Sequence, residues 1–154
     1  MATITRAQAE VEMISRLGKK MTFANLDGAT VDGTNTDLSG AFAVALRGLG
    51  ITPSNPFTVT DSDLSGVGSD DLEQFMDRAE LRVWENILGN LDTVDIKTST
   101  RSHSYSQIAS QAEKAIERLE AKMQSKYGDG VGALEAGVIE LDFQARTDDE
   151  ITEE

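Results

Sequence analysis

Residues 69–91 constrain the fold most, because their apolar side chains recur with helical spacing on two sides of the segment. The first row comprises Leu72, Phe75, Met76, Ala79, Val83 and Ile87, and the second comprises Leu81, Trp84 and Leu88. A helix with apolar residues on two sides lies at the centre of a bundle, or packs on its own bundle and on another chain. We expect Ser69 or Asp70 to cap it.

Two shorter helices are expected before this element. The residues TRAQ at positions 5–8 match a capping box, in which a hydroxyl and an amide side chain satisfy free backbone N–H groups. Gly18 is a typical residue at which the first helix would stop. Its apolar face is expected to comprise Ala7, Val11, Ile14 and Leu17. A second, largely buried helix is expected over residues 40–49, with Asp37 or Ser39 as its cap.

The segments that follow these two helices contain turn residues. Residues 25–37 hold two Asp-Gly pairs, which supply the positive-φ steps of tight turns, so we expect a loop. Residues 51–59 hold both prolines of the chain. Because the residue before a proline disfavours helical backbone, this segment is expected to be an extended connector.

The second half of the chain predicts one long helix. It begins at Ser102 or Ser104 and continues to about Tyr127, where Gly128 follows. Its inward face is expected to comprise Tyr105, Ile108, Ala112, Ile116, Leu119 and Met123. Residues 94–98 alternate in polarity and are a candidate short strand before it.

Residues 138–143 (VIELDF) alternate apolar and acidic side chains with the period of a β-strand. Such a strand is either a sheet edge or an arm that lies on another subunit. The acidic tail, residues 147–154, lacks a core face and is expected to be disordered. The predicted fold class is therefore mainly α: a small bundle of three to four helices in residues 1–136, with an extended C-terminal arm in residues 137–154.

Composition excludes several function classes. The 154 residues suit one domain, and the absence of Cys excludes disulfides, thiolate metal sites and a catalytic thiol. A net charge of −13 argues against binding to nucleic acid or to an anionic membrane, which need clustered Lys and Arg. The N-terminus lacks a secretory pattern, and the longest apolar run is far shorter than the about 20 residues that cross a bilayer.

The stretch TDSDLSGVGSDDLE at residues 60–73 resembles the start of a calcium-binding EF-hand loop. Positions 1, 3, 5 and 6 of that loop would be Asp61, Asp63, Ser65 and Gly66. Position 12, which must be a bidentate glutamate, is Leu72, and Glu73 comes one residue late. We therefore expect turns and a helix cap here, and no metal site.

The sequence contains no catalytic pattern. His103, the single histidine, stands between two serines and is expected to be a polar linker residue. The glycine-rich pieces at 66–68 and 128–132 lack the residues that accompany phosphate-binding loops. We therefore expect neither enzymatic activity nor a cofactor.

Charged residues recur at helical spacing on the two long helices. The acidic stripe comprises Asp70, Glu73, Asp77 and Glu80, and the basic stripe comprises Lys114, Arg118, Lys122 and Lys126. Like charges at this spacing destabilise an isolated helix, so a compensating contact is expected. Either both stripes are solvated faces softened by local ion pairs, or they face each other across subunits in a head-to-tail contact, which can close into a ring.

The order of these elements is similar to that of the head–tail connector (adaptor) proteins of tailed bacteriophages. The resemblance rests on DGTNTDL (32–38), FTVTDSDLSG (57–66), DRAELRVWENILGNLDTVDI (77–96), TRSHSYSQIASQAEKAIERLEAKMQSKYG (100–128) and GVIELDF (137–143). It implies a structural virion protein of the neck, assembled in host cytoplasm as a ring, usually of about twelve copies, beneath the portal protein. Such a ring binds the next neck or tail protein and extends the channel through which DNA passes without sequence-specific contact.

The interface hypothesis combines this resemblance with the charge and apolar patterns. Its residues are the two stripes, Trp84, and Val138, Ile139, Leu141 and Phe143 of the arm. The alternative hypothesis is another non-enzymatic helical interaction or capsid-assembly module.

Overall fold

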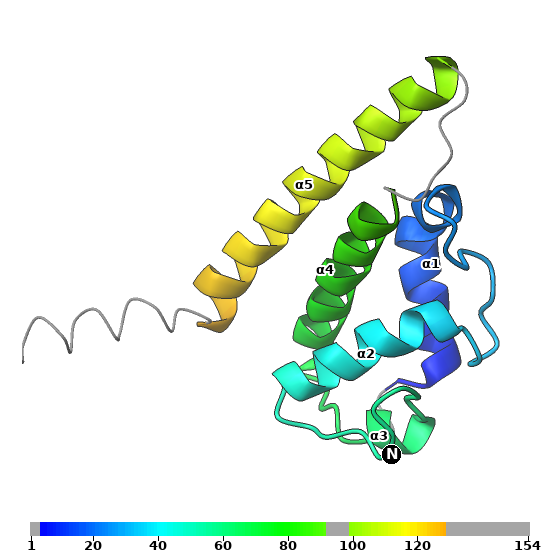
Figure 1. Ribbon diagram of the computed structural model, residues 1–154. Coiled ribbons are helices and arrows are strands. Elements are labelled where there is room, and N and C mark those ends of the chain that lie inside the picture. The colour runs from blue at the N-terminus through cyan, green and yellow to red at the C-terminus, as the bar shows by residue number, and fades with distance from the viewer. Residues whose placement is uncertain (1–3, 92–98, 129–154) are drawn as a thin grey trace, which may run out of the picture. The chain divides into compact units, whose positions relative to one another are not determined.

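The computed structural model describes residues 4–91 and 99–128, and these residues are mainly helical, as the sequence predicts (Figure 1). The described elements are α1 (Arg6–Phe23), α2 (Thr36–Gly48), α3 (Asp61–Leu64), α4 (Leu72–Leu91) and α5 (Ser99–Tyr127). The chain divides into two compact units, Met1–Ala121 and Lys122–Glu154, with the boundary inside α5. The candidate strand at 94–98, the arm and the acidic tail lie outside the described residues.

The predicted capping box at the start of α1 is confirmed. The Thr5 hydroxyl accepts a hydrogen bond from the backbone N–H of Gln8, and the Gln8 side chain accepts one from the N–H of Thr5 at 2.9 Å. The predicted stop at Gly18 is wrong, because α1 continues to Phe23. Gly18 instead allows a close approach: a Cβ at this position would lie 2.8 Å from the carbonyl oxygen of Gly28.

The predicted apolar face of α1 is also wrong in part. Of its four residues, only Leu17 is fully buried, and Val11 is 52 % exposed. The buried face comprises Arg6, Ala9, Glu10, Met13, Leu17, Gly18 and Met21. Two charged residues lie on this face and interrupt its apolar pattern, which is why hydrophobic spacing alone selected the wrong side.

The start of α2 lies four residues before the predicted one. Asn35 is the cap, and its side-chain oxygen accepts hydrogen bonds from the backbone N–H groups of Asp37 and Leu38. Neither Asp37 nor Ser39 is the cap that the sequence predicts; Ser39 lies inside the helix and is buried. The loop before α2 is confirmed as far as Asn35. Of its two Asp-Gly pairs, only the second has the predicted positive φ, 92° at Gly33, whereas Gly28 does not.

Much of the described core forms where α2 packs on α4, and the two helices cross in Figure 1. The rings of Phe42 and Phe75 stack there with 5.8 Å between their centroids. In α4, Leu72 begins the helix three residues later than predicted. The residues of its first apolar row are buried apart from Leu72, and Leu81 and Leu88 of the second row pack against the same core. Both rows therefore pack on the core of this chain, with Leu72, Leu81 and Leu88 partly exposed.

Helix α5 starts earlier than the sequence predicts, at Ser99, so that His103 lies within a helix and not in a linker. Its end at Tyr127 is as predicted, and Gly128 follows with a positive φ of 74°. Ala112 and Leu119 of its inward face belong to the buried core. Within residues 4–91 and 99–128, no helix is both long enough and apolar enough to cross a membrane.

Candidate functional site: an acid-rimmed pocket beside an exposed phenylalanine

A buried ion pair lies within the first two turns of α1. Arg6 and Glu10 are four residues apart and therefore adjacent on one helical face. The guanidinium Nε of Arg6 donates to the Glu10 carboxylate at 3.0 Å, and the two residues are only 5 % and 0 % exposed. A buried pair of this kind requires further hydrogen bonds to offset the loss of hydration of both charges.

Backbone groups from two other segments and a serine hydroxyl from a third supply those hydrogen bonds. Arg6 donates through Nη1 to the carbonyl of Val59 at 2.8 Å, and through Nη2 to the carbonyl of Asn35 at 2.7 Å and to the Ser39 hydroxyl. Glu10 accepts from the N–H groups of Gly33, at 2.7 Å, and Asn35, at 3.0 Å. The ion pair thus joins α1 to the loop before α2, to α2 itself and to the connector that precedes α3.

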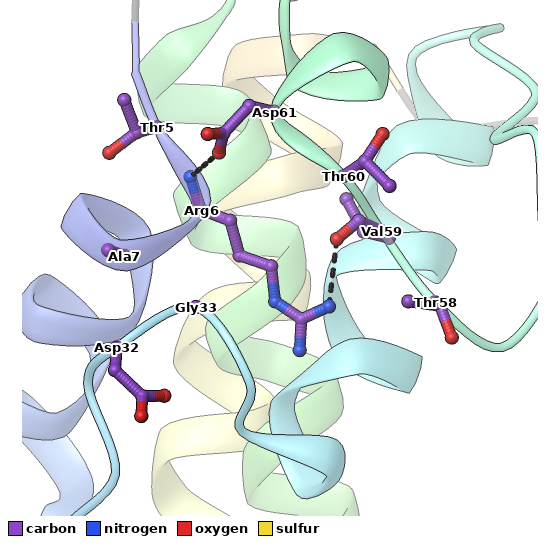
Figure 2. A pocket seen from close by; sticks show the side chains of 9 residues that line it. All are labelled: Thr5, Arg6, Ala7, Asp32, Gly33, Thr58, Val59, Thr60 and Asp61. Atoms are coloured by element: carbon purple, nitrogen blue, oxygen red, sulfur yellow. Dashed lines mark hydrogen bonds between the residues drawn. The ribbon is translucent and has the colours of Figure 1, made fainter.

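An open pocket of about 380 Å³ lies beside this ion pair (Figure 2). Asp32 reaches the pocket from the loop before α2, and Asp61 reaches it from the first turn of α3. Asp61 also accepts a hydrogen bond from the backbone N–H of Arg6 at 2.7 Å, the first free N–H of α1. The other residues that line the pocket are Thr5, Arg6, Ala7, Gly33, Thr58, Val59 and Thr60.

The chemistry of this pocket suits binding of a cation. Hydrogen bonds from the side chain and the backbone N–H of Thr34 hold the pKa of Asp32 below its usual range, so this carboxylate stays charged near neutral pH. Arg6 directs its guanidinium donors at partners inside the chain. The outer rim therefore presents the negative charge of Asp32 and Asp61 together with threonine hydroxyls.

Asp63 closes a short loop next to this pocket. Its Oδ1 accepts from the N–H and the hydroxyl of Ser54, both at 2.9 Å. Its Oδ2 accepts from the N–H of Thr60 at 2.8 Å and from the Thr60 hydroxyl at 2.9 Å. These hydrogen bonds, with the Ser54 N–H first, lower the pKa of Asp63 to about 2. We call residues 54–60 the Asp63-closed loop.

The Asp63-closed loop presents Phe57 at its tip. Asn55 and Thr58 form an isolated antiparallel bridge, and the Asn55 side chain accepts from the N–H of Phe57 at 2.9 Å. Pro56 between them has a restricted φ. Phe57 is 81 % exposed, the greatest exposure of any large hydrophobic side chain in the described part of the chain.

Residues 60–73, which resemble the start of an EF-hand loop, fold differently from a calcium-binding loop. Residues 61–64 form the short helix α3, capped by Thr60, and not the turning loop that carries calcium ligands. The carboxylate of Asp61 accepts a hydrogen bond from the backbone N–H of Arg6, and that of Asp63 accepts hydrogen bonds from the N–H groups of Ser54 and Thr60. In the described ranges, no group of three or more acidic or histidine side chains is arranged to hold a metal ion.

The acidic stripe does not form one exposed surface. Asp70 and Glu73 are exposed, whereas Asp77 and Glu80 are buried. One carboxylate oxygen of Glu80 accepts a hydrogen bond from the guanidinium of Arg16 in α1 at 3.0 Å. The guanidinium of Arg118 in α5 lies 3.8 Å from the other oxygen. One contact between the acidic and the basic stripe therefore forms inside a single chain.

The other predicted interface residues are dispersed. Lys114, Arg118 and Lys126 are exposed on α5, and Lys122 is half-buried. Trp84 is buried, with the ammonium group of Lys20 4.9 Å from its ring centroid, so it is not available to a neighbouring chain. The predicted arm residues, at positions 138, 139, 141 and 143, lie outside the described residues.

Comparison with protein-family models, with curated proteins and with solved structures gives no match for this chain.

Proposed function

We propose that this protein is a ring-forming head–tail adaptor of a tailed bacteriophage, a structural virion protein without enzymatic activity. It would join the portal protein to the next neck or tail protein and extend the channel for DNA. The element order of the sequence resembles that family. The observation that supports an interaction role is the exposed Phe57, held by a closed loop beside an acid-rimmed pocket.

The geometry of this surface favours protein binding over chemistry. A large aromatic side chain loses its contact with water when a partner covers it, and a loop that is already ordered loses little entropy on binding. The buried charges beneath it are paired with one another and with backbone groups. The net charge of −13 also suits a channel protein, because an acidic wall lets DNA slide past.

The proposal is tested with particles assembled in the absence of this protein. We expect heads that package DNA but fail to join tails and fail to retain the DNA, with restoration when the wild-type protein is supplied. Tailed, DNA-filled particles without the protein would refute the proposal. Failure to form closed heads would instead favour the alternative, a capsid-assembly module.

The arm hypothesis has a separate test. Removing residues 137–154 should leave the helical circular dichroism of the protein unchanged and abolish its binding to the portal protein. Unchanged portal binding would mean that the arm is not the portal contact. The adaptor role itself is tested by the particle experiment.

A further inference from the structure

We infer that the Asp63-closed loop and the pocket beside it bind the outer face of α5 in a second copy of this chain. We define the outer face of α5 as Ser110, Lys114 and Arg118, which are four residues apart and exposed. In this contact, Phe57 packs against the aliphatic parts of the Lys114 and Arg118 side chains. The ammonium group of Lys114 extends between Asp32 and Asp61. The inference rests on the proposed ring and names the surfaces that would close it.

The first support is the preorganised exposure of Phe57. Asp63 binds both ends of its loop, and the Asn55–Thr58 bridge orders the tip. Phenylalanine is among the residues enriched at the cores of protein interfaces. Little conformational entropy remains to be lost when a partner covers it.

The second support is the distribution of charge around the loop. Residues 48–60 contain no charged side chain, in a protein of net charge −13. Residues 48–60 themselves therefore add no side-chain charge to a contact between two acidic copies. The adjoining rim, by contrast, carries Asp32 and Asp61 from two different segments, so a partner must bring a cation to that position.

The third support is that α5 carries such cations beside surface on which an aromatic ring can pack. Lys114 and Arg118 are exposed on α5, whereas Ala112 and Leu119 of the same helix are buried. The side chain of Arg118 is 70 % exposed even though one nitrogen lies 3.8 Å from Glu80. Long cationic side chains offer apolar stems and a cation–π contact to an aromatic ring.

The two surfaces differ, and every copy has both. Such a contact is head-to-tail, and repeated copies close into a ring when the rotation between them permits it. It also replaces the pairing of the two charged stripes across subunits. Two members of the acidic stripe, Asp77 and Glu80, are already buried within the chain, whereas Asp32 and Asp61 remain at the surface.

The absence of Cys makes a clean cross-linking test possible. Full-length Thr58→Cys and Ser110→Cys proteins, each carrying one cysteine, are mixed at high concentration and treated with a short bismaleimide. The mixture should give covalent dimers that neither protein gives alone. Ser15→Cys on α1 replaces Thr58→Cys in the matched control, since Ser15 is exposed as well. No dimer above that control, or efficient dimers from Thr58→Cys alone, would overturn the inference.

Side-chain replacements test the energy of the contact in the same assay. Adding Phe57→Ala to the Thr58→Cys protein should reduce the dimer yield about tenfold, as expected for an interface anchor. Val11→Ala is the control, because Val11 is exposed on α1. Lys114→Glu in the Ser110→Cys protein should also reduce the yield, and Asp32→Lys in the Thr58→Cys protein should restore part of it. Unchanged yield with Phe57→Ala would overturn the inference.

The cross-linking result and the particle experiment can fail separately. If particles require the protein but the cysteine pair gives no dimer, the contact is wrong and the adaptor role stands. If the pair gives dimers but particles form normally without the protein, the contact stands and the adaptor role fails.

Discussion

Removal of the Glu10 carboxylate is expected to cost a large part of the folding free energy. Glu10→Ala leaves the guanidinium of Arg6 buried without its counter-charge. It also leaves the backbone N–H groups of Gly33 and Asn35 without their acceptor. Removing one member of a buried ion pair costs about 3–5 kcal/mol.

The cost is not larger than this range, because Arg6 keeps its hydrogen bonds to Val59, Asn35 and Ser39 in the variant. A domain of this size has a total stability of about 5–15 kcal/mol, so Glu10→Ala should remain folded only narrowly. Glu10→Gln keeps the shape but loses the charge, and its amide nitrogen must face another donor. We expect an intermediate cost of about 2 kcal/mol for it.

The assay is urea unfolding followed by the fluorescence of Trp84, the single and buried tryptophan, and by circular dichroism. Glu12→Ala is the matched control. Glu12 lies on the same helix and pairs with Arg16 at the same spacing, but both side chains are substantially exposed, so the loss should be below about 1 kcal/mol. A Glu10→Ala cost within about 1 kcal/mol of the control would refute the assignment of a buried, energetically important pair.

A double replacement tests why the pair is there. In several proteins a buried ion pair is replaced by apolar residues at no cost. Here Arg6→Met with Glu10→Leu should still destabilise the protein by about 2 kcal/mol or more, because the carbonyl of Val59 and the N–H groups of Gly33 and Asn35 lose their partners. A stable double variant would show that these backbone groups find water instead.

Three further measurements follow from local geometry. The lowered pKa of Asp63, about 2, means that its stabilising hydrogen bonds are complete above about pH 4 and are lost as pH falls toward 2, so the protection of amides in residues 54–60, measured against their intrinsic exchange rates, should fall over that window. Asp63→Asn should accelerate the same amides at neutral pH; unchanged exchange would refute the loop closure. Gly28→Ala should destabilise by about 1–3 kcal/mol, since its Cβ would clash with the Gly18 carbonyl, whereas Gly40→Ala in open space should stabilise by up to about 1 kcal/mol. Equal urea midpoints for these two variants would contradict the packing. Calcium should leave the calorimetric signal flat.

The helices were predictable from periodicity, but several of their ends were not. Thr5 caps α1 through a hydrogen bond three residues away, so the sequence reveals it. Gly18 resembles a stop locally, yet it lies inside α1 because the chain returns at Gly28 and needs the space. Asn35 caps α2 while its backbone carbonyl accepts from Arg6, a contact across 29 positions. Ends that depend on distant partners leave no local pattern.

The candidate site was largely missed for the same reason. Arg6–Glu10 and Glu12–Arg16 are both oppositely charged pairs four residues apart on one helix, and sequence alone treats them alike. One is buried and the other is exposed, because only the first faces the segments that meet under the pocket. One local feature indicated the burial of Glu10: it lies three residues before Met13, and residues at that spacing share a helical face, here the buried face of α1. Phe57 carried no signal, because an aromatic residue near proline is as readily buried as exposed.

Residues 60–73 show how one local pattern serves two distant contacts. Alternate carboxylates suggest a shared ion, but Asp61 and Asp63 accept hydrogen bonds from different segments: Asp61 from α1, and Asp63 from the loop that carries Phe57. Three backbone N–H groups, those of Arg6, Ser54 and Thr60, take these carboxylates as acceptors, so the acidic spacing is explained without a metal. The same two contacts place Asp61 on the pocket rim and order the tip beside it. The stretch therefore contributes to the inferred subunit contact by placing Asp61 on the pocket rim and by closing the loop that carries Phe57.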